Sequence, residues 1–120
     1  MDKTLLLVDD EANILKALQR IFSPFGYQVQ TADSGERGLE ILRQGKVDLV
    51  ISDMRMPGMN GHEFLKQVRA ISPTTMRAIL SGFAEGRDVI GCLRDGSARM
   101  YILKPWDNEL LVREVEKPVF

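Results

Sequence analysis

The chain has 120 residues, of which 44% are apolar and 28% are charged, so it has the size and composition of one globular domain with its own core. Sixteen lysines and arginines against seventeen acidic residues give a net charge of −1, which argues against a nucleic-acid-coating surface or a polybasic membrane anchor. The single cysteine, Cys92, excludes an internal disulfide framework, and no apolar run is long enough for a membrane span or a signal peptide. We therefore expect a cytoplasmic protein without direct nucleic-acid or membrane contact.

Five short segments have the pattern of β-strands. One of them, residues 27–32, alternates apolar and polar side chains, which favours an edge strand with one wetter face. The others are continuous apolar runs, typical of parallel strands that are covered by helices on both faces. These runs are residues 5–8, 49–51, 78–80 and 101–103.

Helical patterns fill the gaps between these strands. The first helix is expected from Ile14 to Phe25, where apolar residues recur at a spacing of three to four, and Gly26 follows as a stop signal. Ser34 and Asn60 are candidate N-caps of the next two helices. The remaining helical segments are residues 34–45, 60–71, 89–93 and 110–115. Strand and helix alternate five times, which predicts a doubly wound α/β fold with helices on both faces of a parallel sheet.

Polar side chains follow four of the predicted strands. Asp9 and Asp10 come after the first strand, and Asp53 comes after the third. Ser81 and Lys104 follow the fourth and fifth. Because the carboxyl ends of parallel strands meet at one edge of an open α/β sheet, we expect these side chains to lie in one cleft.

Three carboxylates in one cleft repel each other unless a cation lies among them, and hard oxygen ligands favour Mg²⁺, with Mn²⁺ as the alternative metal. We expect Asp10 and Asp53 to bind the metal directly and Asp9 to bind it through a water molecule. The backbone carbonyl of Arg55 can supply a further oxygen. A nucleotide site is not expected, because the chain has neither GxGxxG nor GxxxxGK[ST].

Four motifs occur in a fixed order: residues 6–11 (LLVDDE), 53–61 (DMRMPGMNG), 81–82 (SG) and 104–106 (KPW). In this order and spacing they resemble the motifs of bacterial two-component response-regulator receiver domains, of which the chemotaxis regulators are one type. The resemblance covers essentially the whole chain. It implies a flavodoxin-like (βα)5 three-layer sandwich with strand order 2-1-3-4-5. It also implies a receiver domain at residues 1–117, followed at 118–120 by a tail or the start of a linker to an output domain that is absent here.

The resemblance further implies a phosphorelay signalling switch rather than an enzyme. Asp53 would accept a phosphoryl group from a phosphohistidine on a sensor histidine kinase or phosphotransfer protein. Lys104 and the Ser81 hydroxyl would each bind a phosphoryl oxygen. Movement of Ser81 would let the Tyr101 ring turn inward and change the surface of the fourth helix, fifth strand and fifth helix. An output domain or effector protein, or a second copy in a homodimer, would bind that surface. The domain would catalyse only its own phosphotransfer and self-dephosphorylation.

Two other functions compete with this interpretation. One is a pseudo-receiver that is never phosphorylated and acts only as a protein-binding module, but none of the expected acidic, hydroxyl and lysine residues is missing. The other is a phosphatase with an aspartyl nucleophile. Such an enzyme needs a second aspartate two residues after the nucleophile, and Arg55 stands at that position.

Overall fold

The computed structural model describes residues 3–82 and 85–116. In this part of the chain, five parallel strands form one sheet in the order β2-β1-β3-β4-β5. The strands are β1 (Lys3–Val8), β2 (Tyr27–Ala32), β3 (Leu49–Asp53), β4 (Met76–Ser81) and β5 (Met100–Leu103). The helices are α1 (Ala12–Phe22), α2 (Gly35–Gln44), α3 (Gly61–Ile71), α4 (Gly86–Arg94) and α5 (Asn108–Glu116). The predicted fold class and strand order are confirmed.

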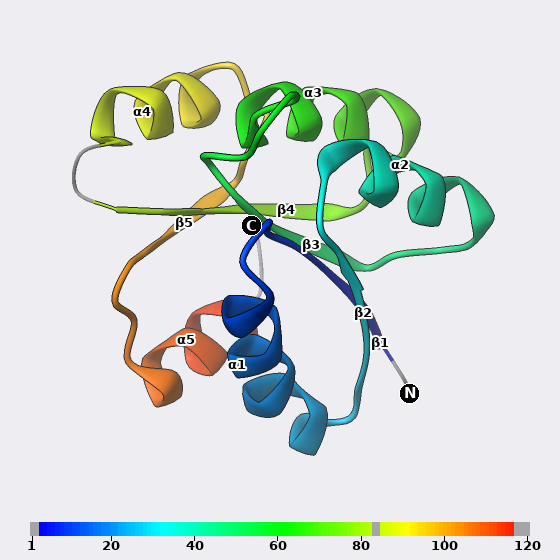
Figure 1. The fold of residues 1–120 in the computed structure, drawn as a ribbon, viewed down its shortest axis with the longest axis vertical. Coiled ribbons are helices and arrows are strands. Elements are labelled where there is room, and N and C mark those ends of the chain that lie inside the picture. Colours follow the sequence, from blue (N-terminus) through cyan, green and yellow to red (C-terminus); the bar gives the residue numbers. More distant parts are fainter. Residues whose placement is uncertain (1–2, 83–84, 117–120) are drawn as a thin grey trace.

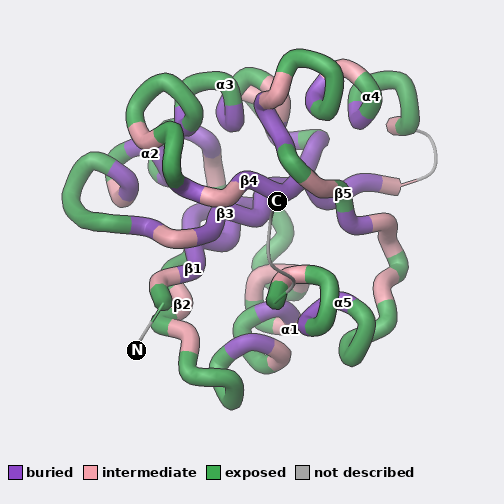
Figure 2. The backbone as a smooth tube through the Cα atoms, turned by 180° about the vertical axis from the view of Figure 1, so that it is seen from behind, coloured by how far each residue is buried: buried purple, intermediate pink, exposed green. Residues whose placement is uncertain are grey.

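The sheet is the middle of three layers. Helices α1 and α5 cover one face, and α2, α3 and α4 cover the other (Figure 1). Along β1, Leu5 and Leu7 pack in the core beneath α1 and α5, whereas Leu6 and Val8 pack beneath α2 and α3. This alternation follows from the two-residue period of a strand, and it explains why β1 is apolar without interruption. The buried strands and the exposed outer faces of the helices are visible in Figure 2.

Side chains cap two of the helices as the sequence predicts. The Ser34 hydroxyl accepts a hydrogen bond from the Arg37 amide at 3.1 Å at the start of α2. At the start of α3, the Asn60 side chain accepts from the Glu63 amide at 2.9 Å, and the Glu63 side chain accepts from the Asn60 amide at 3.1 Å. The two reciprocal hydrogen bonds between Asn60 and Glu63 form a capping box, which satisfies two amides that a helix start leaves unpaired.

The first helix ends earlier than the apolar spacing predicts. α1 stops at Phe22, and Ser23–Phe25 form a separate 3₁₀ turn, η1, before Gly26. Pro24 explains the change, because it has no amide hydrogen for the α-helical ladder. The three-to-four spacing of apolar residues therefore predicted the buried face of α1 correctly, but it placed the end of the helix too late in the chain.

The prediction that residues 101–103 form a strand covered on both faces is also wrong. β5 is an edge strand, and Tyr101 is 54% exposed. A short apolar run does not distinguish a central strand from an edge strand with an exposed aromatic residue.

Within the described ranges, no helix is long and apolar enough to cross a membrane. The predicted tail at residues 118–120 lies outside the described residues. The strands bring their carboxyl ends to one edge of the sheet, and this edge carries the candidate site.

Candidate functional site

A lysine and a buried aspartate are paired at the carboxyl edge of the sheet. Asp53 ends β3 and is 4% exposed. Lys104 directly follows β5, and its Nζ donates a hydrogen bond to Asp53 Oδ1 at 2.8 Å. The backbone amide of Lys104 donates to the Ser81 carbonyl at 2.7 Å, which fixes the start of the loop that carries the lysine. Burial raises the pKa of the Asp53 carboxyl, although the hydrogen bond from Lys104 opposes this shift.

Two further carboxylates complete the acidic cluster, defined as Asp9, Asp10 and Asp53. One oxygen from each lies within 4.8 Å of the others. Asp9 is 1% exposed, and its Oδ1 accepts the Glu11 amide at 2.9 Å. Burial, with a further contribution from the charge of Asp53, raises the pKa of Asp9 to about 6, although the Glu11 amide opposes the shift. Asp10 is exposed, so the cluster is open to solvent on one side.

The acidic cluster fits a hard divalent cation. Asp9 Oδ2 is buried, and it has no hydrogen-bond partner among the residues that the structure describes. A buried carboxylate oxygen without a partner costs free energy, and a metal ion would remove that cost. Carboxylate oxygens that are close together and partly hydrated are the ligands that Mg²⁺ prefers.

Ser81 lies at the end of β4, where the predicted hydroxyl should be. It is 1% exposed and lies in register with Leu103, the residue before Lys104. Tyr101 lies in register with Ile79, two residues before Ser81, and its exposed position leaves the ring on the surface. The structure therefore brings Ser81 to the edge that carries the acidic cluster and places Tyr101 on the neighbouring strand outside it.

A salt-bridge cluster above this edge was not predicted from the sequence. Arg55 Nε lies 3.2 Å from Glu85 Oε2, and Arg55 Nη2 lies 3.5 Å from Asp88 Oδ2. Glu85 also accepts the Gly82 amide at 2.7 Å through its other carboxylate oxygen. The charge of Glu85 contributes to the raised pKa of Asp53, so Glu85 belongs to the electrostatic surroundings of the site. No local motif marks it, because its role depends on contacts between the loop after β3 and the start of α4.

A glycine fixes the loop that carries Arg55. Gly61, the first residue of α3, donates its amide to the Met54 carbonyl at 2.9 Å. A Cβ at this position would collide with the Asp53 carbonyl oxygen, so the close approach of α3 to the end of β3 requires glycine. This contact explains why a glycine ends the motif at residues 53–61.

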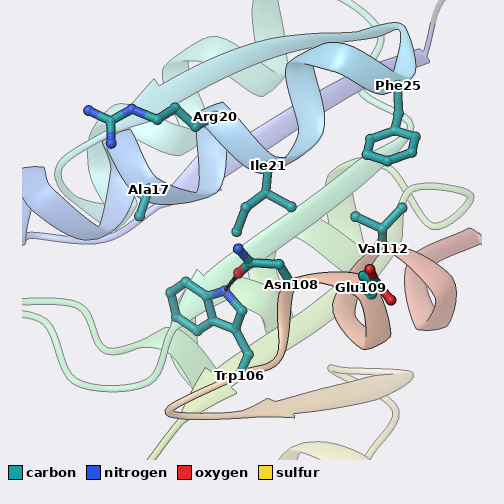
Figure 3. A pocket seen from close by; sticks show the side chains of 8 residues that line it. All are labelled: Ala17, Arg20, Ile21, Phe25, Trp106, Asn108, Glu109 and Val112. Carbon is teal, nitrogen blue, oxygen red and sulfur yellow. Dashed lines mark hydrogen bonds between the residues drawn. The ribbon is translucent and has the colours of Figure 1, made fainter.

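A separate hollow of about 370 Å³ lies between α1 and α5 (Figure 3). It is lined by Ala17, Arg20, Ile21, Phe25, Trp106, Asn108, Glu109 and Val112. The Trp106 indole N–H donates to Asn108 Oδ1 at 3.0 Å. Trp106 is the only tryptophan and lies two residues after Lys104, so its fluorescence can report changes at the carboxyl edge. The Lys104–Pro105 bond is cis.

Together, these features define a class. The sheet is five-stranded and doubly wound, and its carboxyl edge carries clustered carboxylates and a lysine that donates a hydrogen bond to a buried aspartate. This is the arrangement of a small regulatory domain that accepts a phosphoryl group. Comparison with known families identifies the particular one, since residues 5–116 match the response regulator receiver domain. The chain belongs to this family, and its function is that of a phosphorylation-based receiver in two-component signalling. Neither the pseudo-receiver nor the phosphatase alternative has better support.

Individual relatives agree with this assignment. The chain is 35% identical to the hydrogenase transcriptional regulatory protein HoxA of Cupriavidus necator over 97% of its own length and 24% of that protein. It is 32% identical to sporulation initiation phosphotransferase F of Bacillus subtilis, over 98% of this chain and 94% of the relative. The response regulator TrrA of Thermotoga maritima, solved in complex with Mg²⁺ and BeF, superposes with a TM-score of 0.84 at 31% identity, over 95% of this chain and 96% of the other. The chain thus spans about a quarter of the length of HoxA and nearly all of the shorter relative.

Proposed function

We propose that Asp53 is the residue that accepts the phosphoryl group. The observation that carries this proposal is the 2.8 Å contact from Lys104 Nζ to the buried Asp53 carboxylate, beside the two other acidic side chains. A carboxylate oxygen of Asp53 attacks phosphorus, the P–N bond of the donor phosphohistidine breaks, and the imidazole leaves with the electron pair. Lys104 and the Ser81 hydroxyl would each bind a phosphoryl oxygen, so catalysis would consist of positioning and charge neutralisation.

The donor histidine belongs to another protein. His62 is the only histidine of the chain, and its Nε2 lies 2.7 Å from Asp95 Oδ2 at the end of α4. It is held between α3 and α4 and is not part of the acidic cluster. A sensor histidine kinase or a phosphotransfer protein is therefore the proposed donor.

Asp10, Asp53 and the Arg55 carbonyl are the proposed direct ligands of Mg²⁺, and Asp9 would bind it through water. Mn²⁺ would bind in the same way. When bound, the metal offsets charge between the carboxylate and the phosphoryl oxygens. The buried, unpartnered Asp9 Oδ2 supports a cation at this position, and so does the magnesium-containing complex of TrrA.

The proposed output is a change at the surface formed by α4, β5 and α5. Phosphorylation replaces the single negative charge of the Asp53 carboxylate with a phosphoryl group that carries about −1.5 to −2, and Ser81 and Lys104 move to meet it. Because Ser81 and Tyr101 lie on adjacent strands, the shift of Ser81 gives the Tyr101 ring room to turn inward. Large apolar side chains stand exposed on this surface and would bind an output domain, an effector protein or a second copy. They are Ile90, Leu93, Tyr101 and Leu110.

The wider setting is also part of the proposal. The receiver domain comprises residues 1–117, and residues 118–120 are a tail or the start of a linker. HoxA is about four times the length of the matched region, which supports an output domain beyond it. We place the protein in the cytoplasm, without direct nucleic-acid or membrane contact. The domain would remove its own phosphoryl group by catalysing hydrolysis of the aspartyl phosphate.

Incubation with acetyl phosphate and Mg²⁺ tests the phosphoacceptor. We expect the intact mass to rise by one phosphoryl group and Trp106 fluorescence to change, and we expect both effects to disappear in Asp53→Asn. Asp33→Asn is the matched control, because Asp33 is an exposed acid just after β2 at the same edge of the sheet. Labelling that survives in Asp53→Asn would contradict the assignment, and the absence of labelling in the wild type would favour the pseudo-receiver.

A further inference from the structure

Three arginines from different elements meet at the opposite, amino edge of the sheet. Arg69 lies in the last turn of α3, Arg77 is the second residue of β4, and Arg99 immediately precedes β5. All three line one pocket of about 380 Å³, here called the arginine pocket, together with Leu93, Gly96 and Ala98.

Arg77 is a buried cation whose hydrogen bonds all go to neutral groups. It is 4% exposed. Its Nε donates to the Ser97 carbonyl at 2.9 Å, and Nη1 donates to the carbonyls of Pro73 and Thr75 at 3.2 and 2.9 Å. Nη2 donates to the Gly96 carbonyl at 3.1 Å. A guanidinium has five N–H groups, so one N–H of Nη2 has no partner among the residues described.

The pocket concentrates the positive charge of three arginines. Within the described ranges, none of Arg69, Arg77 and Arg99 forms an ion pair with a carboxylate. Asp95, which precedes Gly96 in the chain, directs its carboxylate to His62, Lys66 and Ser97, and Arg69 donates only to its backbone carbonyl. Burial lowers the pKa of Arg77, and the charges of Arg69 and Arg99 lower it further.

The shape of the loop keeps this charge facing the pocket. Gly96 has a φ of +78°, and a Cβ added there would come within 3.1 Å of Arg69 Nη1. Glycine at position 96 thus permits the positive φ of the turn, and it also leaves room for the Arg69 side chain to pack against the turn. Leu93, which is 39% exposed, supplies an apolar wall beside the three guanidinium groups.

We propose that the arginine pocket binds a small molecule that carries a phosphate or diphosphate group. Guanidinium groups form strong, planar hydrogen bonds with phosphate oxygens, so Arg69 and Arg99 would bind the anion. Arg77, which has no carboxylate partner among the described residues, would add its positive charge and its one remaining N–H. The volume is in the range of small-molecule sites, and Leu93 can contact the part of the ligand that is not phosphate. This site is separate from Asp53, which terminates the neighbouring strand β3 at the opposite edge of the sheet.

Titration of the metal-free protein with inorganic pyrophosphate, followed by amide NMR, tests the proposal. At low salt we expect saturable binding with a Kd of about 1 mM or tighter, and shifts centred on Gly96, Ser97 and Arg99. ADP is the second probe, and tighter binding than pyrophosphate would show that the wall at Leu93 contributes. Arg99→Gln and Arg69→Gln should each weaken binding by about tenfold or more.

The matched control is Arg113→Gln, which removes the same charge from an exposed position of α5 on the other face of the sheet. Because Arg99 is exposed, its variant should fold normally and keep the thermal midpoint of the wild type. Equal weakening in Arg113→Gln, shifts centred on Asp53, or no binding of either probe would overturn the proposal. So would binding of an acidic hexaglutamate peptide to these residues when neither phosphate probe binds.

Discussion

The two edges of the sheet carry buried charges of opposite sign. At the carboxyl edge, Asp9 and Asp53 are buried beside one lysine, and Asp9 Oδ2 has no hydrogen-bond partner among the described residues. At the amino edge, Arg77 is buried and donates to four backbone carbonyls. The comparison shows that a buried charge can have two different roles, one structural and one in binding an ion. Arg77 is largely satisfied and holds a loop in place, whereas the acidic cluster stays incompletely satisfied until a cation binds.

The largest expected effect is on stability at the amino edge. Arg77→Ala removes four hydrogen bonds, two of them buried and two partly buried, and leaves their carbonyls without this donor, so the free energy of unfolding should fall by about 3 to 5 kcal/mol. Urea denaturation measures this change. Arg99→Ala, at an exposed position, should change it by less than about 0.5 kcal/mol. Similar values for the two variants would show that the hydrogen bonds of Arg77 do not hold the loop after α4 in place.

Lys104 should have the next largest effect, on rate rather than on stability. Lys104→Ala removes the cation from beside Asp53 and should slow phosphorylation by acetyl phosphate by about 100-fold, because one positioned donor is typically worth this much. Stopped-flow Trp106 fluorescence follows the reaction. Lys66→Ala is the control, since Lys66 is exposed and lies 3.9 Å from Asp95. An unchanged rate in Lys104→Ala would show that the lysine only packs against Asp53.

The raised pKa of Asp9 predicts that one substitution, Asp9→Asn, increases the stability of the metal-free protein and decreases its affinity for Mg²⁺. The folded-state pKa of about 6 lies above the ordinary value of 3.8 for an aspartate, so folding favours the protonated form, and stability is lost as the pH rises from about 4 to 6. Asp9→Asn should therefore stabilise the metal-free protein at pH 7 by about 1 to 2 kcal/mol and weaken Mg²⁺ binding.

Mg²⁺ affinity of the wild type should rise through the same interval, by up to about tenfold per pH unit below pH 6. Thermal denaturation with and without Mg²⁺ measures both effects of Asp9→Asn. Asp10→Asn, which changes an exposed acid of the same cluster, should weaken Mg²⁺ binding but stabilise the metal-free protein much less than Asp9→Asn, because the charge of Asp10 is the smallest of the causes that raise the pKa of Asp9. A destabilised Asp9→Asn protein would show that the Asp9 carboxylate is satisfied without a metal.

The smallest effect is expected at Arg55. Its side chain is 68% exposed in the ion pair with Glu85, so Arg55→Ala should change stability by at most about 1 kcal/mol. The backbone carbonyl remains in the variant, and Mg²⁺ affinity measured by fluorescence titration should stay within about twofold of the wild type. A large loss of affinity would mean that the guanidinium, and not the carbonyl, matters for the metal.

Local patterns predicted most of the fold. Strand type and order followed from short apolar runs, from their alternation with helices and from the family motifs, and Ser34 and Asn60 were identified as caps because a cap depends on residues within one helical turn. Asp9, Asp10, Asp53, Ser81 and Lys104 could be placed together because parallel strands share a carboxyl edge.

What the sequence did not reveal depends on contacts between distant segments. Arg77 looks like an ordinary polar start to a strand, and only the loop after α4 makes it a buried cation. Glu85 acquires its role from Arg55, thirty positions earlier in the chain. The exposure of Tyr101 follows from the position of β5 at the sheet edge, which the family motifs implied through the strand order but the apolar run alone does not encode.

Chemical mapping of the phosphorylated residue tests the central claim most directly. After reaction with acetyl phosphate and Mg²⁺, reduction with borohydride converts an aspartyl phosphate to homoserine, and peptide mass analysis locates the product. We predict homoserine at residue 53, and its absence when Mg²⁺ is removed. Homoserine at Asp9 or Asp10 instead, or equal modification without Mg²⁺, would contradict the account.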